Sequence, residues 1–276
     1  MPNHVTNSFL YVSDKEKFKK LAINSGNEID FEIIEPTPKD LKITTSGLYR
    51  EYENDEIILS VMDYIKANCQ ELSQDEVTEN VLKLVDRRKL RRFKKYNASS
   101  LEYFENIVRA MYNKQKYGYE DWYNFQCEEW GTKWNAYDQY VSEDLTCIEF
   151  HTAWSSPYAW LEKLAKEIDF TLVFADEDTG SNCGIVYTEN HKIKVVRIDR
   201  EFSLALATVF SLTVQGCDIR EYADMYEEAD EKEYADEIRG GIKLKKHLDK
   251  QLRLMKYLPF SNMRISNLAC LNLVEV

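Results

Sequence analysis

Apolar and polar positions alternate along several short segments of the chain, a pattern typical of half-buried strands. The segments are residues 5–12, 145–152, 170–174, 183–187 and 193–198. Ser13 and Glu16 form a capping-box pair ahead of a short amphipathic helix. Residues 31–34 are a brief extended piece in front of two prolines, and Ser156 with Pro157 begins a second helix. The predicted order is strand, helix, strand, helix, hairpin.

From about Asp55 to Tyr117, apolar residues recur every three or four positions, which predicts three helices and no strand. The second and third of these helices begin at further capping-box pairs, which start at Ser73 and Ser99. This stretch therefore differs in kind from the strand-rich segments on either side of it.

After residue 200 the chain is again mostly helical. Residues 202–214 suit either a helix or a strand, whereas 219–229 and 244–255 are predicted helices separated at Gly240-Gly241. The whole pattern predicts an α+β protein. Its parts are a core of residues 1–50 and 117–199, a helical insertion at 51–116, and a mainly helical C-terminal region at 200–276.

The 276 residues carry a formal net charge of −12, which is unevenly distributed. Seven of the 36 cationic side chains gather in one short cluster: Arg87, Arg88, Lys89, Arg91, Arg92, Lys94 and Lys95. Residues 221–237, in contrast, hold nine acidic residues and one lysine. The overall charge argues against a dedicated nucleic-acid binder, because neutralising phosphates needs clustered cations. The basic cluster is either a solvated helix end or a contact surface for phosphates or for the acidic segment of a second copy.

Few residues have the spacing of a metal or catalytic site. The six cysteines are scattered without a CxxC pair, which argues against a zinc ribbon, an iron–sulfur site or a disulfide framework. His151, Asp176, Asp178 and Cys183 could converge at one end of the sheet, but their spacing fits no zinc or calcium loop. We expect no metal, no cofactor and no enzymatic activity.

No apolar run approaches the ~18 residues that suggest a membrane span, and the N-terminus lacks the layout of a signal peptide. The expected location is therefore the cytoplasm, with no membrane partner.

Three tryptophan-rich motifs carry a resemblance to a known family. They are Tyr117-Gly118-Tyr119-Glu120-Asp121-Trp122-Tyr123, Trp130-Gly131-Thr132-Lys133-Trp134-Asn135-Ala136 and Phe150-His151-Thr152-Ala153-Trp154-Ser155-Ser156-Pro157. Together with the opening residues 1–7, they resemble the YubB-like family of phage and plasmid proteins. The resemblance covers roughly residues 1–45 and 117–190. It implies a ferredoxin-like βαββαβ sandwich, here without any cluster, and a mobile-element gene.

The tryptophan-rich block has a plain interpretation and a functional one. In the plain interpretation its rings pack the sheet against the helices and Gly131 allows a tight turn. In the functional one Trp130, Lys133 and Trp134 form a binding surface, because tryptophan is enriched at interface hot spots and stacking platforms. Lys133, between two tryptophans, would lie across their rings or bind an anion.

We therefore expect a non-enzymatic accessory protein that binds and inhibits a host protein complex, for example a defence nuclease, and that forms a homo-oligomer. The expected partner-binding residues are the seven of the basic cluster with Trp130, Lys133 and Trp134. One alternative is a single-stranded DNA- or RNA-binding module built on the tryptophan motif. A second alternative is a metal-dependent hydrolase that uses the acidic turn at Asp176 and Asp178.

Overall fold

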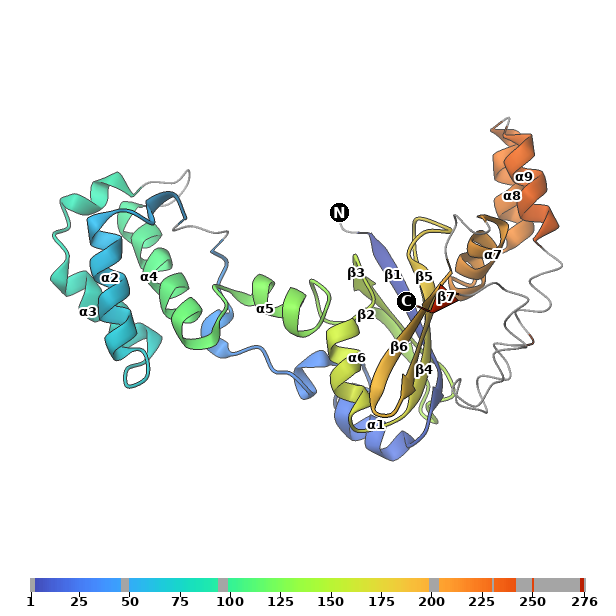
Figure 1. Cartoon of the computed structure of the whole chain (residues 1–276), viewed down its shortest axis with the longest axis horizontal. Coiled ribbons are helices and arrows are strands. Elements are labelled where there is room, and N and C mark those ends of the chain that lie inside the picture. The colour runs from blue at the N-terminus through green and yellow to red at the C-terminus, as the bar shows by residue number, and fades with distance from the viewer. Residues whose placement is uncertain are drawn as a thin grey trace. The chain divides into compact units, whose positions relative to one another are not determined.

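A computed structural model describes residues 3–45, 50–93, 99–198, 204–229, 231–241, 250 and 274–275 (Figure 1). The chain forms two compact units. One is built from Met1–Pro36 and Glu129–Val276, and the other from Thr37–Glu128. We call them the sheet unit and the helical unit. The limits predicted for the helical insertion, 51 and 116, both fall inside the helical unit.

The sheet unit contains an antiparallel sheet with the strand order β2-β3-β1-β4-β5-β6-β7. The strands are β1 (His4–Val12), β2 (Tyr137–Val141), β3 (Ile148–Ala153), β4 (Phe170–Asp176), β5 (Cys183–Glu189), β6 (Lys192–Arg197) and β7 (Val274–Glu275). With helices α1 (Lys15–Ala22) and α6 (Tyr158–Ala165), the first four strands follow the βαββαβ order of a ferredoxin-like sandwich. The predicted α+β fold class is confirmed.

Two helices pack on one face of the sheet, and three others contribute to a second core on the opposite face (Figure 1). α1 and α6 pack on one face through Phe18, Trp160 and Leu164, which meet Phe9 and Phe174 of the strands. A second apolar core lies on the other face of the sheet. It is formed by residues of β4, β5 and β6 together with α7 (Leu204–Val214), α8 (Ile219–Glu228) and α9 (Lys232–Gly240). Residues 202–214, which suited a helix or a strand, thus lie largely in α7. The helix predicted at 244–255 falls, apart from Lys250, outside the described residues.

Two local predictions were wrong. Asp14, not Ser13, caps α1, because the Asp14 side chain accepts a hydrogen bond from Lys17 N at 2.9 Å. Residues Phe31–Ile33 form a 3₁₀ helix capped by Asp30 rather than an extended piece. The second strand of the sandwich is instead β2, a short strand with weak apolar alternation.

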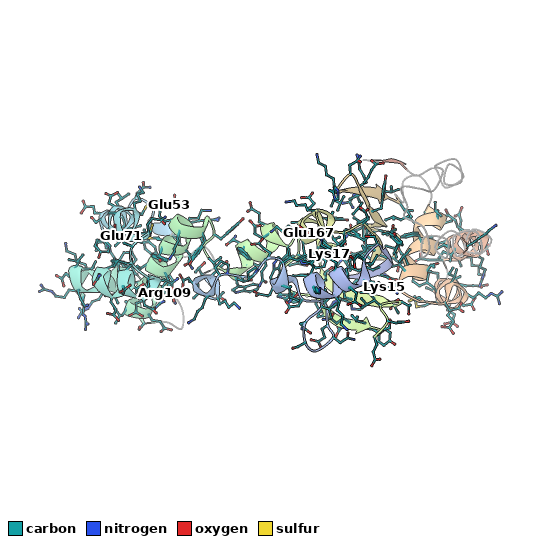
Figure 2. All side chains as sticks on the ribbon, turned by 90° about the horizontal axis from the view of Figure 1, so that it is seen from below. Lys15, Lys17, Glu53, Glu71, Arg109 and Glu167 are labelled. Atoms are coloured by element: carbon teal, nitrogen blue, oxygen red, sulfur yellow. The ribbon has the colours of Figure 1, made fainter. Side chains whose placement is uncertain are left out.

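Ion pairs and lysine–carbonyl bonds hold α1 in place. Lys17 Nζ lies 2.8 Å from Glu167 Oε2, and Lys15 Nζ donates to Asp144 O at 2.8 Å (all but Asp144 are labelled in Figure 2). The hydrogen bond and the charge of Lys17 hold the pKa of Glu167 below its usual value. α1 is thus tied both to the end of α6 and to the loop between β2 and β3.

Lys163 of α6 joins the two points where the chain leaves and re-enters the sheet unit. Its Nζ lies 2.9 Å from Glu35 Oε2 and 2.6 Å from Glu129 Oε2, and it also donates to Glu129 O at 3.0 Å. Trp130 Nε1 donates to Glu35 O at 2.9 Å. Because Lys163 is only 22% exposed, these charge-assisted bonds are better shielded from water than a surface pair.

The helical unit is formed by α2 (Glu56–Asn68), α3 (Gln74–Leu84), α4 (Ser100–Tyr117) and α5 (Trp122–Glu129). The capping box at Ser73 and Glu76 is confirmed, and Ser99 Oγ accepts from Glu102 N at 3.2 Å. α2, α3 and α4 enclose an apolar core that includes Ile58, Val81 and Phe104.

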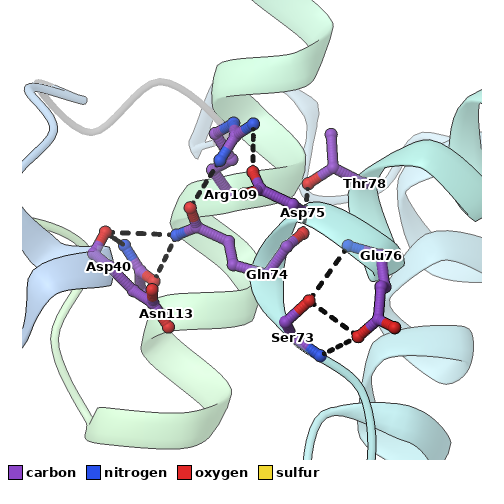
Figure 3. Close-up of polar contacts among 8 residues, drawn as sticks. All are labelled: Asp40, Ser73, Gln74, Asp75, Glu76, Thr78, Arg109 and Asn113. Carbon is purple, nitrogen blue, oxygen red and sulfur yellow. Dashed lines mark hydrogen bonds and ion pairs between the residues drawn. The ribbon is translucent and has the colours of Figure 1, made fainter.

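A polar network fixes α3 and α4 to the segment before α2 (Figure 3). Asn113, which is fully buried, donates to Asp40 O at 2.9 Å and to Glu120 O at 3.0 Å. Its Oδ1 accepts from Gln74 Nε2 at 2.7 Å, and Gln74 Oε1 accepts from Arg109 at 2.6 Å. A buried amide that satisfies several partners specifies one arrangement of these segments.

Candidate functional site

The tryptophan motif at 130–134 is a turn locked between β3 and α6. Trp130 is 1% exposed and belongs to the core, and Thr132 Oγ1 donates to Ala153 O at 2.8 Å. Gly131 has φ +81°, and a Cβ there would lie 2.9 Å from Tyr158 N at the start of α6. Only glycine fits this approach without strain. The plain interpretation therefore holds for Trp130, and that residue cannot serve as an exposed binding side chain.

Lys133 and Trp134 follow this turn and, unlike Trp130, reach the surface. Lys133 Nζ lies 4.7 Å from the ring centroid of Trp134 and 5.0 Å from that of Trp154. Both distances are within the range of a cation–π interaction. The lysine is thus held between two indoles, as the sequence suggested, but the second indole is Trp154 and not Trp130.

Trp154 combines exposure with backbone strain. Its side chain is 44% exposed, and its backbone φ is +70°. Trp154 N donates to Asn3 O at 2.8 Å, so the strained conformation is held by the start of the chain. A bulky residue with positive φ is a genuine outlier, and such strain concentrates at functional sites.

Lys133, Trp134 and Trp154 lie at one end of a sheet face that carries exposed polar and aromatic side chains. His151 of β3 pairs with Thr6 of β1 and with Tyr137 of β2, so these three side chains share one face. Thr6 also pairs with Ala175, a residue of the core beneath α7, so this face lies opposite α1 and α6. We call its β2-β3-β1 half, together with Lys133, Trp134 and Trp154, the aromatic patch.

A β-bulge in β2 enlarges the aromatic patch. The register shifts between Tyr137 and Tyr140, and Asp138 within the bulge has φ +44°. In a regular strand these two tyrosines would point to opposite faces, whereas the bulge pairs them with His151 and Glu149 on one face. Tyr140 is 61% exposed as a result. No pattern in the sequence indicates this bulge, so Tyr140 was not foreseen as a site residue.

Two histidines and Tyr137 form the centre of the aromatic patch. His4 Nδ1 lies 2.7 Å from Tyr137 Oη, and the rings of His4 and His151 are 6.3 Å apart between centroids. Tyr137 also meets Trp134, with a centroid distance of 6.0 Å. Burial, and secondarily the charges of Asp138 and Glu177, raise the pKa of Tyr137 to about 12. The phenol is therefore neutral at physiological pH, and it hydrogen-bonds with His4.

Acidic side chains border the aromatic patch. Asp138 Oδ2 lies 4.0 Å from His151 Nδ1 with its side chain 76% exposed, and Glu149 is exposed on β3. Glu177 is near enough to contribute to the raised pKa of Tyr137. The local field therefore combines aromatic rings and one lysine with several carboxylates, which favours a neutral or basic ligand surface over a polyanion.

The acidic turn considered for metal binding has a structural role. Asp176 is 5% exposed, and its side chain accepts hydrogen bonds from Asn3, Asn182 and the backbone N of Asp178, at 3.0–3.3 Å. Cys183 is buried on β5. No group of three or more potential metal ligands occurs within the part of the chain that the structure describes. Nor do the described residues include a helix both long and apolar enough to cross a membrane.

The basic cluster lies in the other unit. Its 3₁₀ helix, Lys89–Arg92, is anchored by the buried Leu90, whereas Arg87, Arg88, Lys89, Arg91 and Arg92 are exposed. Arg88 pairs with Asp86 at 3.2 Å, and Arg92 pairs with Asp55. Lys94 and Lys95 lie outside the described residues. The predicted partner-binding residues thus belong to two different units.

Comparison with known proteins agrees with the fold. Residues 129–214, from the tryptophan turn to the end of α7, match the model of a family described as a ferredoxin-like domain in Api92-like protein. Neither the curated proteins nor the solved structures gave a match. The ferredoxin-like domain expected from the sequence is therefore confirmed for this part of the chain.

Proposed function

We propose that this chain is a non-enzymatic binding protein and that the aromatic patch is its contact surface for a host protein complex. Trp154 supports this proposal most directly. It is a large aromatic side chain, 44% exposed, in a backbone conformation that costs energy. Tryptophan and tyrosine provide much of the binding energy of protein interfaces, and here they gather on one sheet face.

The charges around the aromatic patch define the partner's chemistry. Exposed Asp138 and Glu149 would meet cationic side chains, whereas the tryptophans and tyrosines would meet apolar ones. A nuclease that binds nucleic acid presents such a surface, because its groove is basic. Covering that groove would inhibit the enzyme without any chemistry on the part of this protein.

The resemblance to YubB-like proteins supports a role on a phage or another mobile element. An accessory protein of this kind acts in the bacterial cytoplasm, where anti-phage defence complexes are found. The proposal is therefore an anti-defence inhibitor, with the ferredoxin-like sandwich as the scaffold for the patch.

The test is a pull-down from a bacterial lysate with tagged wild-type protein and two variants. Trp154→Gly removes the exposed indole. Tyr123→Ala is the matched control, since it removes an aromatic side chain of similar exposure, 38%, from the helical unit. We expect one host complex to be retained by the wild type and the control and to be lost with Trp154→Gly. Added wild-type protein should inhibit the activity of that complex. Equal capture by all three proteins, or capture without inhibition, would contradict the proposal.

A second candidate function is single-stranded DNA or RNA binding at the same patch. Lys133 between Trp134 and Trp154 favours it, because bases stack on aromatic rings and a lysine neutralises phosphate. Trp130 takes no part in this version, since it is buried. A labelled oligouridine is the probe. Binding that weakens steeply as salt rises, and that is lost in Lys133→Glu, would favour this candidate over the protein partner.

A further inference from the structure

A groove between α2 and α3 opens on the helical unit, and the aromatic patch has no part in it. Its volume is about 380 Å³, and Ile57, Val61, Tyr64, Val81 and Val85 supply its apolar lining. Leu84, also part of the lining, is 70% exposed although it is apolar. An exposed leucine beside an apolar groove is typical of a surface that binds the apolar side chain of an amphipathic helix.

Cations of the basic cluster border this groove. Lys89 lines it, and Arg87 and Arg91 lie exposed in the same turn. Two of the neighbouring arginines are engaged, since Arg88 pairs with Asp86 and Arg92 with Asp55. Among the described residues no ion pair engages Arg87, Lys89 or Arg91. The groove thus combines an apolar lining with the polar side chains of Ser60, Glu56, Asp86 and Lys89. Of its two carboxylates, Asp86 is paired with Arg88, so the cations without an ion pair outnumber the remaining carboxylate at this rim.

The outer face of α8 has the complementary pattern. Ile219 and Ala223 bury the inner face of this helix in the sheet unit. Met225 lies on the solvent-exposed side of the helix and is 56% exposed. Glu221 and Glu228, one turn before it and one turn after, are exposed on the same side of the helix. One apolar side chain flanked by two carboxylates matches an apolar groove bordered by cations.

We propose that the chain self-associates, with the acidic outer face of α8 of one copy seated in the α2–α3 groove of a second copy. Met225 would enter the groove beside Leu84, while Glu221 and Glu228 would face Arg87, Lys89 and Arg91. A self-complementary pair of this kind explains why a chain with a net charge of −12 keeps a dense basic cluster on one of its units.

The test is the mass in solution, measured by sedimentation velocity from about 1 to about 100 µM protein at low salt. One variant carries Arg87→Glu with Arg91→Glu, and a second carries Glu221→Lys with Glu228→Lys. A third carries all four changes. The control, Lys19→Glu with Lys20→Glu, makes the charge change of the first variant on exposed positions of α1.

We expect each two-site variant to raise the dissociation constant on the order of a hundredfold, because attraction becomes repulsion. The four-site variant should regain association, because its charges are again complementary. The control and Trp154→Gly should associate as the wild type does, so the result is independent of the aromatic patch. A wild type that stays monomeric at all concentrations would overturn the proposal. So would association that the two-site variants leave unchanged or that the four-site variant does not restore.

Discussion

Substituting Trp154 by glycine and by alanine separates the cost of its backbone conformation from the value of its side chain. Both changes remove an indole that is 44% exposed, and burial of the remaining surface stabilises the fold by about 3 kcal/mol. At φ +70° a non-glycine residue costs about 1–2 kcal/mol, and alanine keeps that cost. Glycine removes this backbone cost. It also makes the unfolded chain more flexible, which lowers the stability of the folded protein by about 0.4–1 kcal/mol.

The alanine variant should therefore be destabilised by about 3 kcal/mol and the glycine variant by about 2 kcal/mol. This order is the reverse of the usual one, in which alanine is the more stable residue. Urea denaturation followed by circular dichroism measures the difference, with equal slopes as the condition for comparing midpoints. An alanine variant as stable as the glycine variant, or more stable, would refute the assignment of strain to Trp154.

Three further predictions concern stability. Asn113→Leu removes a buried donor to two backbone carbonyls and should destabilise the helical unit by about 2–4 kcal/mol, seen as faster proteolysis within 37–128 than in wild type. Burial raises the pKa of Tyr158 to about 12, so the unfolded chain loses this proton first as pH rises above 10. Between pH 10 and 12 the free energy of unfolding of the wild type should fall by about 2–3 kcal/mol more than that of Tyr158→Phe. An equal fall in both proteins, measured by urea denaturation, would contradict this. Gly184→Ala puts a Cβ 2.2 Å from Val196 O and should lower the melting temperature by separating β5 from β6, whereas an unchanged value would show that β5 can shift.

The sequence predicts those elements whose signals are local. Apolar periodicity locates α2, α3 and α4, and the capping box at Ser73 forms as expected. Strands β4 and β5 are apolar along most of their length and can be read directly. β2 escapes the same method because only Val141 in it is fully buried. Gln139 bonds to the loop at Ile29, while Tyr137 and Tyr140 lie in the aromatic patch.

The candidate site is harder to predict, because its residues come together only through pairing of distant strands. The sequence indicates that Lys133 lies between two tryptophans, but it favours the neighbouring Trp130 over the distant Trp154 as the second one. The choice depends on whether each ring points into the core, which the turn at Gly131 decides. The bulge that gathers Tyr137 and Tyr140 on one face is a property of strand pairing and leaves no local signal.

Lys163 has a consequence for how such a chain could have been assembled. Because it holds Glu35 and Glu129 together, the two points where the helical unit joins the sandwich lie side by side on the same framework. In the helical unit the matching ends also meet, since Gln126 contacts Thr37 across 3.4 Å. A short loop could therefore bridge positions 36 and 129 with little change to the sandwich. Recombination could therefore insert, delete or exchange the helical unit as a whole without altering the sequence of the sandwich.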